Sequence, residues 1–167
     1  MERQLRNHNS APFTRCAEQK DRLVKHIVYV SQATKSFSTD DLAELLTHSR
    51  ARNSTDEVTG LLVYRYNDDF KRGNFLQVLE GPEDALEDVW RRISSDPRHH
   101  TIIVLEEGES QTRMFADWSM GFRNVDALDL AKFNGFAELG SDEFWEDAKK
   151  QALPDALVTL RSFYDGV

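Results

Sequence analysis

A glutamine in the middle of an apolar run is the first residue of this sequence whose position could support chemistry. Gln77 lies in the stretch Asn-Phe-Leu-Gln-Val-Leu-Glu-Gly at residues 74–81. Because side chains alternate across a strand, Gln77 shares one face with Phe75 and Leu79, and we expect that face to be buried. An unpaired buried amide costs about 1–3 kcal/mol, but an amide can be satisfied in more than one orientation. Gln77 is therefore a candidate switch, and the alternative is a glutamine that only ties two strands together.

A tyrosine occupies a comparable position in another apolar run. Residues 26–31 read His-Ile-Val-Tyr-Val-Ser, and this β-branched composition predicts a central strand. Alternation puts Tyr29 on one face with Ile27 and Ser31. Tyr29 is either a core aromatic whose hydroxyl is satisfied or a functional phenol, and the strand pattern leaves both interpretations open.

A helix with a partly polar inner face is predicted to follow. Residues 38–41 read Ser-Thr-Asp-Asp, which is typical of a capped helix start with acids in the first turn. Leu42, Leu46, Ser49 and Asn53 then follow at helical spacing, so the apolar stripe ends in two polar side chains. Their burial needs hydrogen-bond partners. Asn53 either caps the end of its own helix or faces a bound polar ligand that lies along the stripe.

The remaining patterns predict a small α+β sandwich. A second helix is predicted to begin at Gly81-Pro82. Further strands are predicted at residues 58–66, 75–80, 101–105 and 117–122. The last strand would place Trp118 and Met120 on one face. The order β-α-β-β-α-β-β predicts a ferredoxin-like fold with a five-stranded mixed sheet and two helices on one face. Helices after residue 124 would cover the other face.

Metal and nucleophile chemistry receive little support from the sequence. Asp68 and Asp69 lie in the polar loop predicted at residues 67–73, where solvated acids are expected. His99 and His100 are adjacent, and no third ligand stands at a matching spacing. The sequence also lacks a nucleophile–base arrangement and a glycine-rich phosphate loop. We therefore predict no metal site and no enzymatic turnover.

Composition narrows the classes of partner. The 167 residues carry a net charge of −8, which argues against nucleic acid and anionic membranes as main partners. No apolar run reaches the length of a membrane span. The single cysteine, Cys16, cannot form an internal disulfide, so we expect a reducing, cytoplasmic location. It lies in a polar segment, residues 1–22, that we expect to be a poorly ordered extension.

The motifs taken in order resemble the BLUF family of flavin-binding blue-light sensor domains. The resemblance covers about residues 23–124, which leaves residues 125–167 as a C-terminal helical cap. It is similar to the short family members in which only a pair of helices follows, so no effector domain is expected. The matching motifs are Tyr-Val-Ser-Gln-Ala at 29–33, Ser-Arg-Ala-Arg-Asn at 49–53, Thr-Gly-Leu-Leu at 59–62, Phe-Leu-Gln-Val-Leu-Glu-Gly at 75–81, Asp-Pro-Arg-His at 96–99 and Trp-Ser-Met-Gly-Phe at 118–122.

This resemblance implies a cofactor and a set of site residues. It implies that FAD lies between the two helices with its ring edge toward the sheet. Blue light would drive electron and proton transfer from Tyr29 to the flavin and leave Gln77 rotated, tautomerised or both, with a red-shifted absorption. Trp118 and Met120 match a pair of which either residue could lie near Gln77, with core packing as the alternative. The implied cofactor-binding residues are Tyr29, Ser49, Arg52, Asn53, Gln77, Arg98 and His99.

The resemblance also implies how the signal leaves the domain. Many short family members are homo-oligomers, so we expect an oligomer that contacts an unidentified downstream protein through the C-terminal helices or the sheet. Arg52 and Arg98 are either partners of flavin carbonyl or phosphate groups or solvated surface residues. The competing functions are a small, for example flavin-dependent, enzyme on the same fold and an adaptor that has lost the flavin. The buried polar residues Tyr29, Asn53 and Gln77 disfavour the adaptor.

Overall fold

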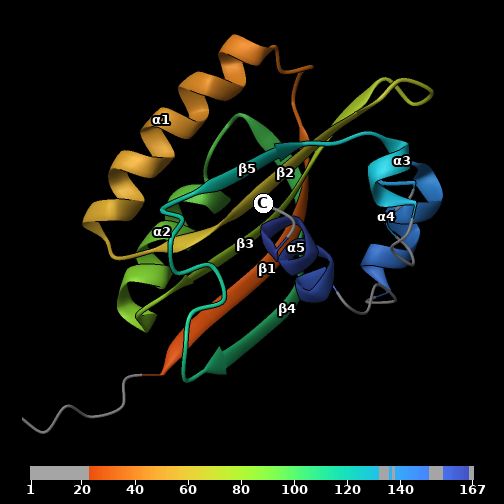
Figure 1. Cartoon of the computed structure of the whole chain (residues 1–167). Coiled ribbons are helices and arrows are strands. Elements are labelled where there is room, and N and C mark those ends of the chain that lie inside the picture. The colour runs from red at the N-terminus through yellow and green to blue at the C-terminus, as the bar shows by residue number, and fades with distance from the viewer. Residues whose placement is uncertain (1–22, 132–135, 137, 151–155, 166–167) are drawn as a thin grey trace, which may run out of the picture.

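A computed structural model describes residues 23–131, 136, 138–150 and 156–165 as one sheet with helices on both faces (Figure 1). Its strands are β1 (Val24–Ala33), β2 (Thr59–Asn67), β3 (Arg72–Gly81), β4 (His99–Ser110) and β5 (Gly121–Asn124). The predicted extension at residues 1–22, with Cys16, lies outside the described residues.

The strand order is β4-β1-β3-β2-β5. Strand β1 is antiparallel to both β3 and β4, and β2 is antiparallel to β3 but parallel to β5. This arrangement confirms the predicted ferredoxin-like order and the five-stranded mixed sheet. It places β1 and β3, the strands that carry Tyr29 and Gln77, at the centre of the sheet.

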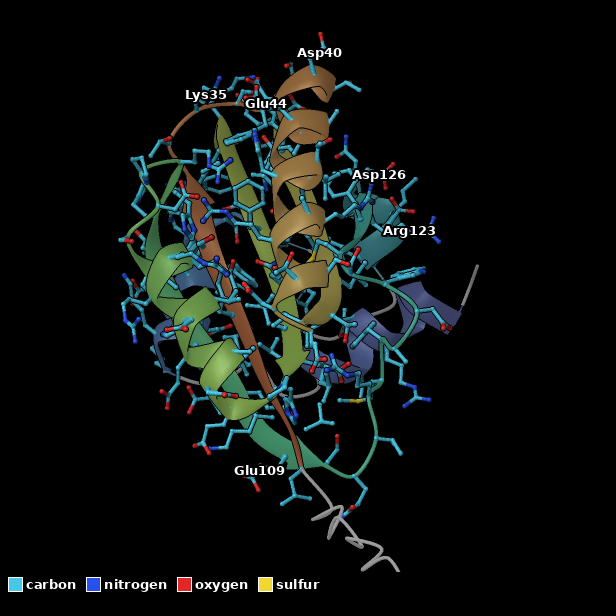
Figure 2. All side chains as sticks on the ribbon, turned by 90° about the vertical axis from the view of Figure 1, so that its left-hand side faces the viewer. Lys35, Asp40, Glu44, Glu109, Arg123 and Asp126 are labelled. Carbon is cyan, nitrogen blue, oxygen red and sulfur yellow. The ribbon has the colours of Figure 1, made fainter. Side chains whose placement is uncertain are left out.

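Two helices, α1 (Thr39–Thr55) and α2 (Glu83–Ser94), pack side by side on one face of the sheet (Figure 2). Helix α1 begins as the sequence predicts, because Ser38 and Asp41 form a reciprocal capping box. Helix α2 has Pro82 at its N-cap position. No helix in the described part of the chain is long and apolar enough to cross a membrane.

The alternation of β3 separates two hydrophobic clusters. Phe75 and Leu79 point toward α1 and α2, whereas Leu76 and Val78 point to the opposite face. That opposite face packs against Phe115 and the C-terminal helices, which are α3 (Ala127–Leu130), α4 (Asp142–Lys149) and α5 (Ala156–Asp165). Gln77 therefore lies on the α1/α2 side, between two buried apolar residues, as predicted.

The loop predicted at residues 67–73 is shorter than expected, because both strands extend into it. Strand β2 continues to Asn67 and β3 starts at Arg72 directly opposite. Asn67 Oδ1 accepts backbone hydrogen bonds at 3.2 and 3.3 Å from the two residues at the turn. The Arg72 guanidinium reaches Gly140 O at 3.1 Å, so this end of the hairpin contacts the C-terminal segment.

The strand predicted at residues 117–122 is wrong for its first four residues. Strand β5 begins only at Gly121, and the preceding residues form turns and bends. The Trp118 ring lies over Gly121, where a Cβ atom would be 1.9 Å from it. Trp118 packs with the cluster of the C-terminal helices, whereas Met120 packs with the α1/α2 cluster. The two side chains therefore do not share a face, because the turn breaks the alternation of a strand.

The close approach of β2 to β3 gives a test of the strand packing. A Cβ atom at Gly60 would lie 2.1 Å from Val78 O, whereas one at Gly81 would meet a movable Val58 methyl group at 3.1 Å. We expect Gly60→Ala to lower the free energy of unfolding by about 1–3 kcal/mol and Gly81→Ala by less. Urea denaturation of both variants measures this difference, and equal losses would contradict the register.

Candidate functional site

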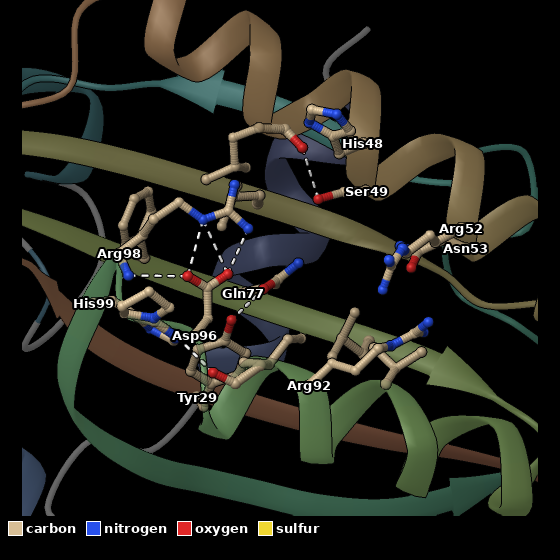
Figure 3. A pocket seen from close by; sticks show the side chains of 17 residues that line it. Tyr29, His48, Ser49, Arg52, Asn53, Gln77, Arg92, Asp96, Arg98 and His99 are labelled. Carbon is tan, nitrogen blue, oxygen red and sulfur yellow. Dashed lines mark hydrogen bonds and ion pairs between the residues drawn. The ribbon is translucent and has the colours of Figure 1, made fainter.

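A cavity of about 520 Å³ lies between α1 and α2, above the centre of the sheet (Figure 3). All seven predicted cofactor-binding residues line it. They are Tyr29, Ser49, Arg52, Asn53, Gln77, Arg98 and His99. The polar end of the α1 stripe, the two central strands and the segment before β4 therefore converge on one space.

A chain of three hydrogen-bonding groups runs from the inner wall of this cavity to the segment before β5. Tyr29 and Gln77 are directly opposed in the β1–β3 register, and the Tyr29 hydroxyl donates to Gln77 Oε1. Gln77 Nε2 in turn donates to Met120 Sδ at 3.2 Å. The three side chains are 3%, 6% and 2% exposed. The amide thus joins β3 to β1 and to the segment before β5, and it still lines the cavity.

The chemistry of these partners favours one orientation of the Gln77 amide. In the observed orientation the carbonyl oxygen faces a hydroxyl donor and the N–H faces a sulfur acceptor. A thioether accepts weakly and donates nothing. If the amide turned over, its oxygen would face Met120 Sδ and would need a donor from elsewhere. The amide therefore has a preferred state and a second state that only a ligand in the cavity could satisfy.

Tyr29 is held as a neutral hydroxyl. Burial, together with the negative charge of Asp96, raises the pKa of Tyr29 above the ordinary tyrosine range. The Trp90 ring packs edge-on against it, with ring centroids 5.2 Å apart. Asp96 itself is partly buried, which favours the neutral acid, but hydrogen bonds from Arg98 hold its pKa below the usual value. The phenol therefore stays protonated and donates a hydrogen bond to Gln77.

The polar end of α1 is satisfied in two different ways. Ser49 Oγ donates to Leu45 O in its own helix at 2.9 Å, and Ser49 remains at the cavity wall (Figure 3). Asn53 Nδ2 donates to Ser119 O at 2.9 Å. The alternative that Asn53 caps its helix is wrong, because α1 continues past it and Asp56 is the C-cap residue. Asn53 instead links α1 to the segment before β5.

His99 has a structural role at the cavity wall. Its ring nitrogens contact Ser31 Oγ and Ile93 O, each at 2.8 Å. These contacts fix the start of β4 against β1 and the end of α2. His100 is exposed, and the described residues contain no group of three side chains suited to hold a metal ion.

The mouth of the cavity carries more polar side chains than the sequence motifs indicate. Besides the predicted arginines, it contains His48 and Arg92, with Asp96 beside Arg98 (Figure 3). His48 and Arg92 were missed as cavity residues, although a helical signal exists for both. His48 is four residues before Arg52, and Arg92 is three residues after the buried Val89. Arg92 also forms an ion pair with Asp56, and Arg98 forms one with Asp96.

The cavity fits a flavin in size and in chemistry. Its volume lies within the range of about 300–1,000 Å³ that is usual for small-molecule sites. Phe75, Leu79 and Val89 supply apolar wall, the amides of Asn53 and Gln77 lie deeper, and the cations lie at the mouth. An aromatic ring system with carbonyl and ring-nitrogen acceptors matches the inner part. Guanidinium groups at the mouth suit phosphate oxygens.

Comparison with known proteins agrees with this geometry. Residues 24–121 match the family model described as BLUF, sensors of blue-light using FAD. The photoactivated adenylate cyclase subunit beta of Euglena longa is 33% identical over 101 residues, which are 60% of this chain and 11% of that protein. The blue light- and temperature-regulated antirepressor BluF of Escherichia coli strain K12 is 30% identical over 94 residues, 56% of this chain and 22% of that protein. The chain thus spans a minor part of these relatives.

Solved structures share the fold. The dark-state structure of BlrB, a BLUF protein, aligns with a TM-score of 0.63 at 24% identity, over 85% of this chain and 95% of that one. BlsA in its photo-activated state aligns with a TM-score of 0.57 at 25% identity, over 81% and 95%. Because the family model covers more than half of the sequence, this chain belongs to the BLUF family of flavin-binding blue-light sensors.

Proposed function

We propose that this protein senses blue light through FAD bound between α1 and α2, with Tyr29 and Gln77 as the residues that respond. The observation that carries the proposal is the buried Tyr29–Gln77–Met120 chain at the inner end of the cavity. Tyr29 and Gln77 line the cavity, and Met120 lies behind the Gln77 amide. A light sensor needs such a group with two hydrogen-bonding states.

Each residue has a distinct task in this proposal. A bound flavin supplies the absorption of blue light and, when excited, an electron acceptor next to the phenol. Tyr29 gives up an electron and its hydroxyl proton, for which Gln77 is the adjacent acceptor. Asn53 and Ser49 orient the ring from α1. Burial of Tyr29 at 3% exposure excludes water that would otherwise exchange with the moving proton.

The response is stored in the Gln77 amide. When the phenol takes its electron and proton back, Gln77 has rotated, tautomerised or both, so that its donors and acceptor face different partners. Met120 Sδ then loses the N–H that it accepts in the structure. New hydrogen bonds toward the ring account for a red-shifted absorption. The original arrangement satisfies the phenol, amide and sulfur together, and for this reason the protein returns to it in the dark.

The cationic mouth supports FAD as the cofactor. Arg52 lies on the exposed rim and makes no ion pair that competes with a ligand within the described chain, whereas Arg98 is paired with Asp96. We assign Arg52 to the phosphates, with His48 and Arg92 beside it. Arg98 and His99 then shape the wall and the end of the ring site. The diphosphate of FAD spreads its negative charge over two phosphate groups, so it can reach more than one of the side chains around this mouth.

The signal leaves through protein contacts. We assign residues 23–124 to light sensing and residues 125–167 to a helical cap that covers the face of the sheet opposite the cavity. A homo-oligomer and an unidentified downstream protein that contacts this cap or the sheet are part of the proposal. So is a cytoplasmic location, which rests on the single cysteine, Cys16.

The photocycle provides the main test. We expect Gln77→Leu and Tyr29→Phe each to bind flavin but to lose the reversible red shift, because each removes one end of the Tyr29–Gln77 bond. Absorption spectra before and after blue light measure the shift. Tyr66→Phe is the matched control, since Tyr66 is only half-buried and does not line the cavity. A normal photocycle in Tyr29→Phe would exclude its assigned role.

The raised pKa of Tyr29 predicts a change of stability in alkali. Above the ordinary tyrosine pKa of about 10, the unfolded chain loses this proton while the native protein keeps it. The native state then binds more protons, so the free energy of unfolding falls by about 1.4 kcal/mol per pH unit, with no effect below pH 10. The free energies of unfolding of the wild type and of Tyr29→Phe are measured by urea denaturation at pH 9 and at pH 11. Between these two pH values the wild type should lose roughly 1 kcal/mol more than Tyr29→Phe does. A constant difference would contradict the buried, neutral phenol.

The identity of the cofactor can be read from the purified protein. We expect heat-released flavin to be FAD, and Arg52→Ala to weaken binding of FAD about two- to tenfold while riboflavin binding stays unchanged, because only FAD carries phosphates. Chromatography of the released flavin and fluorescence titration measure these two results. Release of FMN would contradict FAD as the cofactor, and an equal loss of affinity for riboflavin would remove Arg52 from the phosphate site.

A further inference from the structure

The segment before β5 is held by donors from two other elements. Residues 118–120 are not part of a strand, yet three consecutive carbonyl oxygens are hydrogen-bonded. These bonds run from Gly60 N to Trp118 O at 3.0 Å, from Asn53 Nδ2 to Ser119 O at 2.9 Å and from Arg50 Nε to Met120 O at 2.9 Å. Two of the three donors are side chains of α1, so the helix replaces the missing strand ladder.

Met120 is held by one hydrogen bond at its backbone and by another at its side chain. Its backbone oxygen accepts from Arg50 on the outside, and its sulfur accepts from Gln77 Nε2 at 3.2 Å on the inside. A thioether is a weak acceptor and does not hold its own position. A hydrogen bond from a charged guanidinium to a carbonyl is stronger than a neutral one. The stronger outer bond therefore determines where the weaker inner acceptor lies.

Arg50 acts from outside the flavin cavity. Its side chain lines a second cavity of about 420 Å³ near the start of β5, together with Trp118 and Met120, and it does not line the first. Asn53 makes the neighbouring bond to Ser119 O, but it also lines the flavin cavity. Arg50 is thus the side-chain donor of this segment that can be changed without altering the wall of the first cavity.

We propose that Arg50 is a positioning residue of the photocycle, which fixes the Met120 backbone so that Met120 Sδ remains the acceptor of the Gln77 N–H. This inference rests on the proposed function of Gln77. Arg50 stabilises the dark arrangement of the amide relative to the light-adapted one, because only the dark arrangement uses the sulfur. Loss of Arg50 lowers that preference and slows the return in the dark, to the extent that the return path already re-forms the contact.

The test compares Arg50→Ala, Arg50→Lys and Arg91→Ala. Arg91 is the matched control, because it is an exposed arginine of α2 that pairs with Asp88 in its own helix. In Arg50→Ala we expect the Gln77 side-chain N–H and Met120 methyl NMR signals of the dark, flavin-loaded protein to shift or broaden. The dark-recovery time constant should lengthen about two- to tenfold, which corresponds to the loss of one net hydrogen bond. Arg50→Lys keeps a cationic donor, so its NMR signals and its recovery time should lie between those of Arg50→Ala and the wild type. Arg91→Ala should match the wild type.

Several outcomes would overturn the inference. Unchanged Gln77 and Met120 signals in Arg50→Ala would show that Arg50 does not position the sulfur. Recovery that is unchanged or faster would overturn the kinetic part of the inference, because the return path would then not depend on re-forming the contact between Gln77 and Met120. An equal effect in Arg91→Ala would show a general charge effect. If wild-type protein lacked the reversible red shift, the proposed function would fail. The NMR comparison in the dark would still decide whether Arg50 holds Met120. Arg50 is exposed, so we expect Arg50→Ala to fold. If it did not, the Arg50→Lys variant would decide the question. Its Gln77 side-chain N–H and Met120 methyl signals must then differ from those of the wild type, and unchanged signals would overturn the inference.

Discussion

The requirement that a buried primary amide be satisfied on both sides governs this structure. Gln77 has a hydroxyl donor on one side and a sulfur acceptor on the other, and both partners come from different elements than its own. The hydroxyl can serve either end of the amide, but the sulfur can serve only the N–H end. This asymmetry gives the amide one preferred orientation in the dark. It also makes a second orientation accessible once a ligand supplies the missing partner.

The rest of the fold places these groups and keeps water away from them. The β1–β3 register brings the Tyr29 hydroxyl to the amide, and the packing of α1 and α2 encloses the cavity in front of it. Helix α1 has a second task, because Arg50 and Asn53 hold the segment that carries Met120. The observed arrangement of the amide therefore depends on contacts between β1, β3, α1 and the turn before β5. A reorientation of the Gln77 amide would therefore first alter the contacts among these elements.

Local periodicity predicted much of the site. Strand alternation placed Tyr29 and Gln77 on buried faces, and helical spacing placed Ser49 and Asn53 at the polar end of α1. Those predictions succeeded because each depends on one element only. The pairing of Tyr29 with Gln77 came from family resemblance, since the register of strands about fifty residues apart has no local signal. Resemblance also supplied the flavin, for which the pattern offered only an unnamed polar ligand.

Other features depended on tertiary structure and were missed. A turn before β5 separates Trp118 from Met120, and no residue type in that stretch excludes a continuous strand. The bond from Arg50 to this turn joins groups seventy residues apart. His48 and Arg92 had the right helical spacing, but a polar side chain on the surface and one at a cavity cannot be told apart by sequence until the two helices are placed side by side.

The central claim is that light changes the hydrogen bonding of the Gln77 amide, and vibrational spectroscopy tests it most directly. Light-minus-dark infrared difference spectra would be recorded on protein with isotope-labelled glutamine side chains. We predict a glutamine carbonyl band that moves with the label and reverts in the dark together with the visible spectrum. A reversible flavin shift with no label-sensitive glutamine band would contradict this account.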